Sequence, residues 1–598
     1  MIFLLIVLIV DCVGALNLNN NHFNKFLSGL KKTHDHKIQV GDYIIKRLVH
    51  EEINTGFGYN GGAILPLFDQ IENQEEFKIF INRHEQYCGH CAESYAKNTG
   101  KIGVFVTTSG PGLTNAITPL QDALSDGIPI LCISGQVNSK TLGTDAFQEC
   151  DATSITKPCV KKSYQIKNTE NFIEKFEELL CICNLPRKGP VHLDVCKDIF
   201  TEYISLNSEF SYEKYNLEDK INFDELYSYK CDILKNKIIH SEKPILILGN
   251  GALKSWDNIR TLIEKYHVPT VTTLHGLGIV DELSKFSLGM IGMHGSYTAN
   301  KAIVEADLIV GIGNRFDDRT VGNLQTYGRN ARKNFGIVHI DNSETQIQKV
   351  NTILKPDLSI LADSDNIVEY LVNSNDVNYN NKIKWIDKLT QYKDVYKPKF
   401  KKLSSNYIIS RLSQILENRN DYKISTGVGA HQMVFAQYFN HRYPNKILSS
   451  GSLGTMGVGL PFSIGAQIAD PDCLSILIDG DGSFSMSINE LATITEYNLP
   501  IKIFIMNDRK LGMVDMWQNI FYDKRKIGSN FKFTPKFHEI ANTYGIKSYL
   551  CNSASCVDDI LEKSIKYKGA VLVNFMIEES KSVPFVPNNV SLDKMILN

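Results

Sequence analysis

Short apolar segments alternate with helix-length amphipathic segments along the chain from Val40 onward. An apolar segment of about four to eight residues is typical of a buried strand, and an amphipathic segment between two of them is typical of a connecting helix. Strands joined by helices run parallel, and a parallel sheet is buried by helices on both faces. The pattern therefore predicts an α/β fold of doubly wound parallel sheets.

Two polar stretches divide this pattern into three blocks. The first, from 201 to about 223, is rich in polar and aromatic residues, and the second, from about 374 to 402, is long and charged. The strands that we expect are 103–107, 128–134 and 191–195; 244–249, 270–273, 308–312 and 337–341; and 423–425, 474–478, 501–506 and 570–575. Because 598 residues are too many for one hydrophobic core, we predict three domains, at residues 38–205, 225–373 and 403–598.

Composition excludes several classes of protein. With 43% hydrophobic and 22% charged residues, the chain has the composition of an ordinary soluble globular protein. Its net charge of −2, without a basic run, gives no electrostatic reason to expect nucleic acid or a membrane surface as a partner. The cysteines lie mostly in apolar patterns, which is typical of reduced, buried thiols rather than of a disulfide framework.

The first 37 residues lack the strand and helix pattern. An apolar run at 2–10 precedes small residues at 13–15, and an Asn-rich stretch without a period extends to about residue 37. The run is too short to span a bilayer, but it has the length of a signal-peptide core. We predict a secretory-type targeting presequence at 1–37 and an organellar location, with a plastid favoured over a mitochondrion. The alternative is an irregular terminus without a targeting role.

Two acidic motifs follow expected strands of the third block. Asp481 lies in the sequence Gly-Asp-Gly-Ser after strand 474–478, and Asp508 follows the next strand, 501–506. Carboxyl ends of parallel strands meet at one edge of a sheet, where ligands bind in open α/β folds. Glycines and a helix N-terminus suit a phosphate, and Mg²⁺ prefers one or two carboxylates together with phosphate oxygens. The block therefore predicts a magnesium–diphosphate site.

A separate carboxylate, Glu85, follows an apolar strand that ends at Ile81 in the first block. A diphosphate site paired with a distant carboxylate is the requirement of thiamin diphosphate. A carboxylate against its pyrimidine ring favours the tautomer whose nitrogen can take the proton from the thiazolium carbon. The alternative is a glutamate in the first turn of a helix, where the helix dipole favours negative charge. With the metal motif present, we predict that Glu85 activates the cofactor.

Six longer motifs extend this reading: GYNGGA at 58–63, TSGPG at 108–112, GTDAFQE at 143–149, LGMIGMHG at 288–295, RFDDR at 315–319 and GMVDMW at 512–517. With them, nearly the whole chain from Gln39 to Ile596 resembles the catalytic subunit of acetolactate synthase (acetohydroxyacid synthase). This family depends on thiamin diphosphate. The resemblance implies that the three domains bind its pyrimidine, FAD, and its diphosphate with Mg²⁺, in that order.

The resemblance also implies an activity. The family decarboxylates pyruvate on thiamin diphosphate and condenses the hydroxyethyl carbanion with a second 2-ketoacid, pyruvate or 2-ketobutyrate. The products are 2-acetolactate and 2-aceto-2-hydroxybutyrate, in the first common step of valine, leucine and isoleucine biosynthesis. The catalytic residues that it implies are Glu85, Gln148, Lys197, Arg319 and Trp517.

Two of these residues have a chemical reason for their role. The Arg319 guanidinium is a bidentate partner for the carboxylate of the second 2-ketoacid, and Trp517 offers an apolar contact that favours 2-ketobutyrate. The alternatives are a surface ion pair for Arg319 and core packing for Trp517. Gln148 and Lys197 resemble active-site residues that come from a neighbouring subunit.

Cofactor positions follow from the resemblance as well. Met456 is the expected apolar wedge under thiamin diphosphate. The other expected thiamin diphosphate positions are Gly429, His431, Gly482, Ser483 and Met513, and Lys510 joins Asp481 and Asp508 at the metal. The expected FAD positions are Gly251, Thr273, Leu274, Met293, His294, Gly313, Arg315, Asp318, Asp341 and Asp363. FAD has no net redox role in the family's main reaction, although this domain on its own would suggest a flavin oxidase.

For partners, the resemblance implies a homodimer or homotetramer whose active sites lie at subunit interfaces, and a small regulatory subunit. Glu85 of one subunit would meet the magnesium–diphosphate site of another. Neither nucleic acid nor a membrane is an expected partner.

Several residues depart from the family pattern and keep rival hypotheses open. Asp508 replaces an asparagine, Ala430 replaces a glutamine near the diphosphate, and Tyr87-Cys88 replaces Gly-Ala after Glu85. Asp508 still offers an oxygen, so Mg²⁺ should remain bound. The changes at Ala430 and Tyr87 motivate one rival, a non-catalytic binding subunit. A second rival is a pyruvate oxidase or glyoxylate carboligase, although the latter lacks the activating glutamate.

The third rival is a dithiol oxidoreductase that uses Cys88 and Cys91, which form a Cys-x-x-Cys motif. A haem attachment site is excluded, because Ala92 stands where the motif needs histidine.

Overall fold

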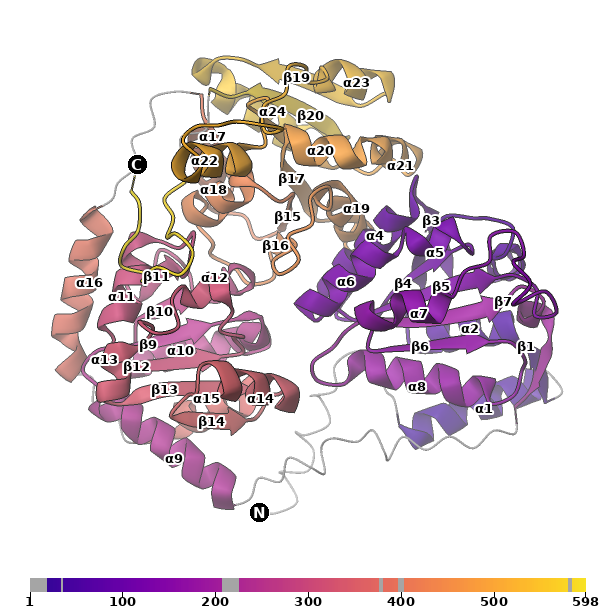
Figure 1. Ribbon diagram of the computed structural model, residues 1–598, viewed down its shortest axis with the longest axis horizontal. Helices are drawn as coiled ribbons and strands as arrows, with labels where there is room; N and C mark the ends of the chain where they lie inside the picture. Colours follow the sequence, from indigo (N-terminus) through magenta and orange to yellow (C-terminus); the bar gives the residue numbers. More distant parts are fainter. Residues whose placement is uncertain are drawn as a thin grey trace. The chain divides into compact units, whose positions relative to one another are not determined.

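The computed structural model of the protein describes residues 19–33, 36–206, 225–375, 380–395, 403–578 and 583–597. The chain forms two compact units. The first comprises Met1–Leu217, Ser450–Ser475 and Ser485–Ile501, and the second comprises Glu218–Ser449, Ile476–Phe484 and Lys502–Asn598. Within the described residues there are three six-stranded sheets and one sheet of two strands (Figure 1).

The first six-stranded sheet lies in the first unit and is parallel throughout, in the order β3-β2-β4-β5-β7-β6. Its strands are β2 (Thr55–Gly58), β3 (Lys78–Ile81), β4 (Gly103–Thr107), β5 (Ile130–Gln136), β6 (Lys162–Ile166) and β7 (Val191–Cys196). Its helices are α2 (Val40–His50), α3 (Leu65–Glu72), α4 (Glu85–Thr99), α5 (Pro111–Thr114), α6 (Ile117–Asp126), α7 (Ala152–Thr156) and α8 (Phe172–Asn184). Figure 1 shows α4 and α6 on one face of this sheet and α8 on the other.

Helix α1 (Asn20–Thr33) corrects one expectation for the N-terminal stretch. Residues 20–33 show no period in the sequence and fall within the predicted presequence, yet Phe23 and Leu27 are buried in the same core cluster as the α2 and α8 side chains. A short antiparallel pair, β1 (Lys37–Gln39) with β8 (Tyr203–Ser205), follows and closes the domain. The first 18 residues, with the apolar run of the predicted presequence, lie outside the described residues.

The second sheet lies in the second unit and is also parallel, in the order β11-β10-β9-β12-β13-β14. Its strands are β9 (Pro244–Leu248), β10 (Thr270–Thr272), β11 (Ser287–Met290), β12 (Leu308–Ile312), β13 (Gly336–Asp341) and β14 (Leu358–Leu361). Its helices are α9 (Glu225–His240), α10 (Trp256–Tyr266), α11 (Tyr297–Glu305), α12 (Asp318–Val321), α13 (Arg329–Lys333), α14 (Glu344–Ile353), α15 (Ser364–Asn373) and α16 (Ile383–Val395). Counted along the chain, this order is 3-2-1-4-5-6, the order of dinucleotide-binding folds.

The third sheet has the order β16-β15-β17-β18-β20-β19. Its strands are β15 (Tyr422–Thr426), β16 (Ile447–Leu448), β17 (Leu474–Gly480), β18 (Lys502–Asn507), β19 (Lys547–Cys551) and β20 (Val571–Met576). The helices of this part of the chain are α17 (Ser405–Ile415), α18 (Ala430–Tyr438), α19 (Gly459–Ala469), α20 (Asp481–Ser487), α21 (Leu491–Glu496), α22 (Gly512–Phe521), α23 (Phe537–Thr543) and α24 (Val557–Lys566). The three parallel sheets confirm the predicted fold class, whereas the exact domain boundaries stay predictions.

Helix α19 belongs to the first unit, where it packs closely on α4. A Cβ atom on Gly465 would lie 2.1 Å from the Ser94 hydroxyl oxygen and 2.2 Å from the Cys91 carbonyl oxygen. The Cys91 thiol donates to the Pro461 carbonyl at 3.2 Å. Only glycine at position 465 allows the two helices to approach this closely, and the contact fixes the helix that begins at Glu85.

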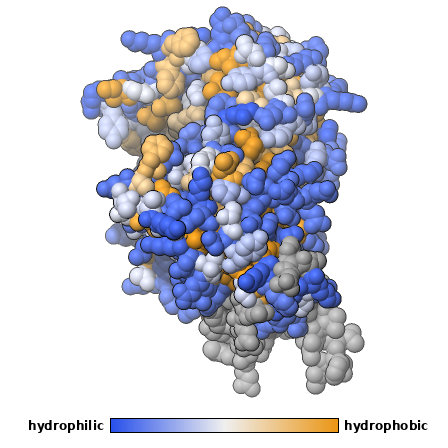
Figure 2. Space-filling model, turned by 90° about the vertical axis from the view of Figure 1, so that its right-hand side faces the viewer, coloured by the Kyte–Doolittle hydropathy of each residue, from blue (hydrophilic) through white to orange (hydrophobic). Residues whose placement is uncertain are grey.

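Apolar surface is scattered on the face that Figure 2 shows, where hydrophilic residues predominate and apolar ones lie in small groups between them. Among the helices of the described ranges, none combines the length and the apolar character needed to cross a bilayer.

Candidate active site

Asp481 and Asp508 of the third domain lie at the carboxyl ends of its parallel strands. Gly480, the last residue of β17, pairs with Met506 of β18, so Asp481 and Asp508 follow neighbouring strand ends. No loop separates β17 from the next helix, because α20 begins at Asp481 itself.

The electrostatics of this edge suit a cation. Asp481 is 2% exposed. Burial raises its pKa to about 7, and the charge of Asp508 contributes to the rise. Next to it, the buried side-chain oxygen of Asn507 accepts no hydrogen bond from the described residues. Two carboxyl groups that disfavour each other's charge are stabilised by a divalent ion, and oxygen donors are the ligands that Mg²⁺ prefers.

Glycines allow close packing of the backbone against polar side chains at the same edge. A Cβ on Gly480 would lie 2.8 Å from the His431 ring, and a Cβ on Gly427 would lie 1.9 Å from an Asp479 oxygen. Gly429 has φ +151°, a conformation that favours glycine, and it directly precedes the N-terminus of α18. His431 Nε2 lies 3.3 Å from Asp479 Oδ1. These residues fit the diphosphate of a cofactor with its metal.

Lys510 is a poor side-chain ligand for that metal. Its ammonium nitrogen lies 4.0 Å from Asp515 Oδ2, and its backbone N–H donates to Asp508 Oδ1 at 3.1 Å. An ammonium group has no lone pair for a metal, so only the carbonyl oxygen of Lys510 can serve as a ligand. Its metal role stays a prediction in that form.

In the first unit, Glu85 is the first residue of α4. His84 precedes it as the N-cap, and the His84 ring accepts a hydrogen bond from the Gln86 N–H at 3.2 Å. The side-chain amide of Asn115 donates to Glu85 Oε2 at 3.0 Å. A Cβ on Gly112 would lie 3.5 Å from Glu85 Oε1. The carboxylate is thus half-buried and oriented by Asn115, a residue that no sequence motif singles out.

Gln148 lies beside the same glycine-rich loop. A Cβ on Gly110 would lie 2.9 Å from the Gln148 carbonyl oxygen, and Gln148 has φ +63°. The Glu149 carboxylate holds this turn, accepting from the N–H groups of Gly143 at 2.5 Å and Ala146 at 2.9 Å. These bonds lower the pKa of Glu149. Glu85 and Gln148 therefore both border the 110–112 loop.

Lys197 and Met456 also belong to the first unit. Lys197 is exposed directly after β7, where its backbone N–H donates to the Gln136 carbonyl at 3.0 Å. Met456 is partly buried in a loop that Ser450 holds: its hydroxyl oxygen accepts from the Thr455 N–H at 3.0 Å, and it donates to Asp122 at 2.7 Å.

Tyr87, which departs from the family pattern, is buried and has a defined hydrogen-bond partner. Tyr87 is 6% exposed, and its hydroxyl donates to the Met486 carbonyl. Burial raises the pKa of Tyr87 to about 12. Nearby, the Asn82 amide and the Arg83 N–H both donate to the buried Glu490 carboxylate, at 2.9 and 2.7 Å. The bulky side chain thus joins a network that holds the start of α4.

Cys88 and Cys91 do not form an accessible dithiol. Both are completely buried, and burial raises the pKa of each thiol well above its usual value. A dithiol oxidoreductase needs at least one thiol that its substrate can reach. The structure therefore argues against the dithiol oxidoreductase hypothesis at this motif.

In the second unit, Arg319 and Met293 lie in contact. An Arg319 guanidinium nitrogen is 2.9 Å from the Met293 sulfur, and the Met293 N–H donates to the Arg319 carbonyl at 2.7 Å. The Arg319 side chain is 54% exposed and its Nε lies 3.7 Å from Asp318 Oδ2, so a surface ion pair remains one description of it. On α22 the buried residues are Asp515 and Met516, while Trp517 and Met513 are only partly buried. Trp517 is therefore not a fully buried core residue, and its role stays a prediction.

The expected FAD positions gather at one edge of the second sheet. They follow the carboxyl ends of its six parallel strands: Gly251 after β9, Thr273 and Leu274 after β10, Met293 and His294 after β11, Gly313, Arg315 and Asp318 after β12, Asp341 at the end of β13 and Asp363 after β14. The strand order reverses between β9 and β12, and ligands bind at such a point. There, a Cβ on Gly251 would lie 2.8 Å from the Gly313 Cα. The edge fits a dinucleotide.

Comparison with known families agrees with this geometry. Three family models match in order: "Thiamine pyrophosphate enzyme, N-terminal TPP binding domain" at 38–155, the central domain at 233–371, and the C-terminal TPP binding domain at 427–575. The chain is thus a thiamine pyrophosphate (thiamin diphosphate) enzyme with all three domains of that class.

Curated relatives narrow the class. The chain is 37% identical over 580 residues to the "Acetolactate synthase large subunit" of Lactococcus lactis. This match covers 95% of this chain and 98% of the relative. It is 36% identical to the "Acetolactate synthase, mitochondrial" of Schizosaccharomyces pombe, over 93% of this chain and 86% of the relative. The same identity holds for the "Acetolactate synthase catalytic subunit, mitochondrial" of Saccharomyces cerevisiae, over 92% and 81%. The chain belongs to the acetolactate synthase large-subunit family.

Proposed function

We infer that the chain is the catalytic subunit of an acetolactate synthase, which joins pyruvate, after loss of CO₂, to a second molecule of pyruvate or to 2-ketobutyrate. The observation that carries this inference is the similarity to acetolactate synthases along 92–95% of the chain, through all three domains. The positions of Glu85, Asp481 and Asp508 at strand and helix ends support it.

We propose that Asp481 and Asp508 hold Mg²⁺ with the diphosphate, together with Gly429, His431 and Ser483. When bound, thiamin diphosphate would supply the nucleophilic carbon chemistry that the condensation needs. Glu85 would hold a proton at Oε1, because Asn115 already donates to Oε2. A carboxyl group fixed in this way protonates a pyrimidine nitrogen without having to reorient.

Substrate selection is proposed for residues of both units. The Arg319 guanidinium, which is half exposed, offers paired N–H donors to the carboxylate of the second ketoacid. Trp517 presents a partly buried ring for the extra methyl group of 2-ketobutyrate. Gln148 and Lys197 complete the set from the first unit. These four side chains would also keep water from the reacting carbon. A proton delivered to that carbon would release acetaldehyde in place of the condensation product.

The FAD site is a proposal for the second sheet, at the edge that carries Gly251, Gly313 and Asp341. We also propose that two copies of the chain share each active site, in a homodimer or homotetramer. Relatives named "large subunit" and "catalytic subunit" support a second, smaller regulatory subunit. Two relatives are named mitochondrial, which supports an organellar location. Among the organelles, we propose the plastid.

Incubating the purified chain with pyruvate, thiamin diphosphate, Mg²⁺ and FAD tests the function. We expect acetolactate, and 2-aceto-2-hydroxybutyrate when 2-ketobutyrate is added. Acetyl phosphate with peroxide would instead identify a pyruvate oxidase. No product from a folded, FAD-loaded protein would leave the non-catalytic subunit as the better description.

A further inference from the structure

Two thiols of the third domain lie in contact. The sulfur atoms of Cys551 and Cys556 are 3.1 Å apart. Cys551 is the last residue of β19, and Cys556 ends the short 3-10 helix Ala554–Cys556, immediately before α24. Both are free cysteines. A disulfide has a sulfur–sulfur distance of about 2.05 Å, so a movement of about 1 Å would close the bond.

The connecting turn holds the two sulfur atoms toward each other. The Ser553 carbonyl oxygen accepts from both thiols, at 3.4 Å from Cys551 and 3.0 Å from Cys556. The Cys556 N–H donates to the same oxygen at 3.3 Å, and the Ser553 hydroxyl accepts from the Ser555 N–H at 3.3 Å. The turn therefore holds both sulfur atoms beside one carbonyl oxygen, facing each other.

The two thiols differ in access. Cys551 is buried, whereas Cys556 is partly exposed and stands among the exposed residues Asn552, Ser553 and Ser555. Burial raises the pKa of Cys551 to about 12, and contact with the Cys556 thiol contributes. An exposed thiol with a buried one directly behind it is suited to stepwise oxidation. The outer sulfur meets the oxidant and the inner one resolves the adduct. Cys88 and Cys91, both fully buried, lack this arrangement.

We propose that Cys551 and Cys556 form a reversible disulfide when the chain meets a small disulfide oxidant such as glutathione disulfide. The Cys556 thiolate attacks one sulfur of glutathione disulfide, forms a mixed disulfide and releases one glutathione thiol. The Cys551 thiolate then attacks the Cys556 sulfur, closes the ring and releases the second glutathione. The two protein thiols lose two electrons and two protons, which appear in two molecules of reduced glutathione.

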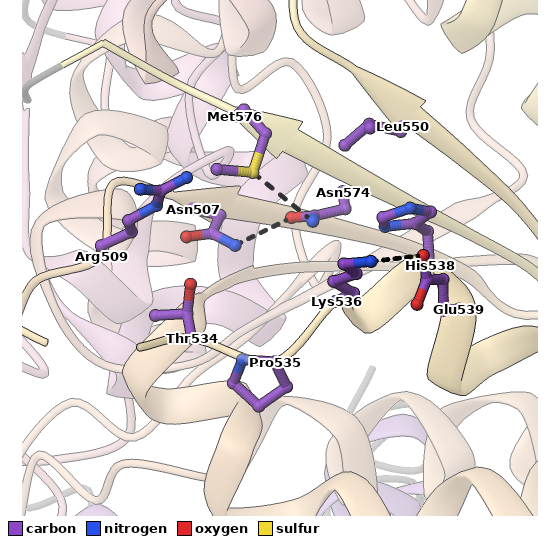
Figure 3. A pocket seen from close by; sticks show the side chains of 10 residues that line it. All are labelled: Asn507, Arg509, Thr534, Pro535, Lys536, His538, Glu539, Leu550, Asn574 and Met576. Carbon is purple, nitrogen blue, oxygen red and sulfur yellow. Dashed lines mark hydrogen bonds and ion pairs between the residues drawn. The ribbon is translucent and has the colours of Figure 1, made fainter. Parts of the chain in front are cut away.

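The disulfide would form at the carboxyl ends of the strands, which is also where Asp481 and Asp508 follow their strands. Cys551 pairs with Phe575 of β20, and Phe575 pairs with Met506 of β18. Strands are about 4.8 Å apart, so Cys551 lies roughly 10 Å from the strand end that leads to Asp508. Leu550, the residue before Cys551, lines a cavity of about 300 Å³ with Asn507, Arg509, His538, Asn574 and Met576 (Figure 3). Oxidation would fasten one wall of this cavity to the start of α24.

Peptide mapping tests the proposal. Trypsin releases Ser548–Lys563, which holds both cysteines and no other. The full-length reduced protein is incubated with glutathione disulfide at about pH 8, close to the usual thiol pKa, then unfolded, alkylated and digested. We expect this peptide to lack alkyl groups and to be lighter by two hydrogen atoms, and dithiothreitol to restore two alkylation sites.

Single variants distinguish the attacking thiol, Cys556, from the resolving thiol, Cys551. Cys551→Ser should keep a glutathione adduct on Cys556, because the resolving thiol is missing. Cys556→Ser should show neither adduct nor disulfide, because Cys551 is buried. The proposal is overturned if the oxidised wild-type peptide still takes up two alkyl groups. It is also overturned if the wild-type peptide retains glutathione at Cys556 without closing the ring.

Discussion

Magnesium affinity is expected to depend on pH through Asp481. In the metal-free protein, burial and the charge of Asp508 raise the pKa of Asp481 to about 7. Mg²⁺ needs the ionised carboxylate, so below that pH the ion must displace a proton. The ionised fraction falls from about 0.9 at pH 8 to about 0.1 at pH 6. The apparent dissociation constant should therefore rise about tenfold over this range, or about 1.4 kcal/mol.

Asp508→Asn removes one cause of the raised pKa while leaving an oxygen ligand in place. The pKa of Asp481 should fall, and the variant should lose less than tenfold in affinity between pH 8 and pH 6. The assay is the Mg²⁺ dependence of acetolactate formation at fixed thiamin diphosphate, measured at several pH values. Titration of the diphosphate itself is common to both proteins and cancels in the comparison.

Asp523→Asn provides the matched control, because Asp523 pairs with Arg525 in an exposed ion pair of the same domain. This variant should reproduce the wild-type pH dependence. If Asp508→Asn and the wild type lose affinity equally as the pH falls, Asp508 does not act on Asp481. If wild-type affinity does not change with pH at all, Asp481 is not a ligand that titrates near pH 7.

Three further predictions concern the first unit. Glu85→Gln should lower turnover by about 100-fold or more while FAD binding is retained; near-normal turnover would remove Glu85 from the mechanism. Gly465→Ala forces a Cβ to within 2.2 Å of the Cys91 carbonyl oxygen and should destabilise the protein by about 1–3 kcal/mol in thermal unfolding. Gly29→Ala is the control, because a Cβ there would meet no atom within 4 Å outside its own helix and chain neighbours; equal melting temperatures of the two variants would contradict the α4–α19 packing. Burial raises the pKa of Asp122 from 3.8 to about 7, so the stability that its protonated form contributes is lost as pH rises through that window. Asp122→Asn should lose less stability than the wild type between about pH 4 and pH 8 in urea unfolding, and parallel curves would refute this.

In the second and third sheets, the central strands were predictable from sequence and the edge strands were not. In the second and third blocks, the sequence missed β11, β14, β16 and β19, which are the four edge strands of their two sheets. A central strand is covered on both faces and reads as a continuous apolar run. An edge strand such as β19, with the sequence Lys-Ser-Tyr-Leu-Cys, is largely exposed and shows no such run.

The site also has features that were predictable from sequence and features that were not. Asp481 and Asp508 were predictable because each directly follows an apolar strand, and strand ends of a parallel sheet meet at one edge. The bond from Asn115 to Glu85, and the bond from Tyr87 to the Met486 carbonyl, were not predictable. Both join residues that only the folded chain brings together. The roles of Lys197, Arg319, Trp517 and the FAD positions came from resemblance alone and stay predictions.

The central claim is that a carboxylate of the first domain and a metal site of the third serve one cofactor molecule, contributed by two copies of the chain. Glu85→Gln and Asp481→Asn should each be inactive alone. When the two variants are co-expressed, a mixed dimer has one site with both residues intact. Random pairing makes about half of the dimers mixed, so about a quarter of wild-type acetolactate formation should return. If activity stays at the level of the single variants although mixed dimers form, the two residues do not meet across the subunits.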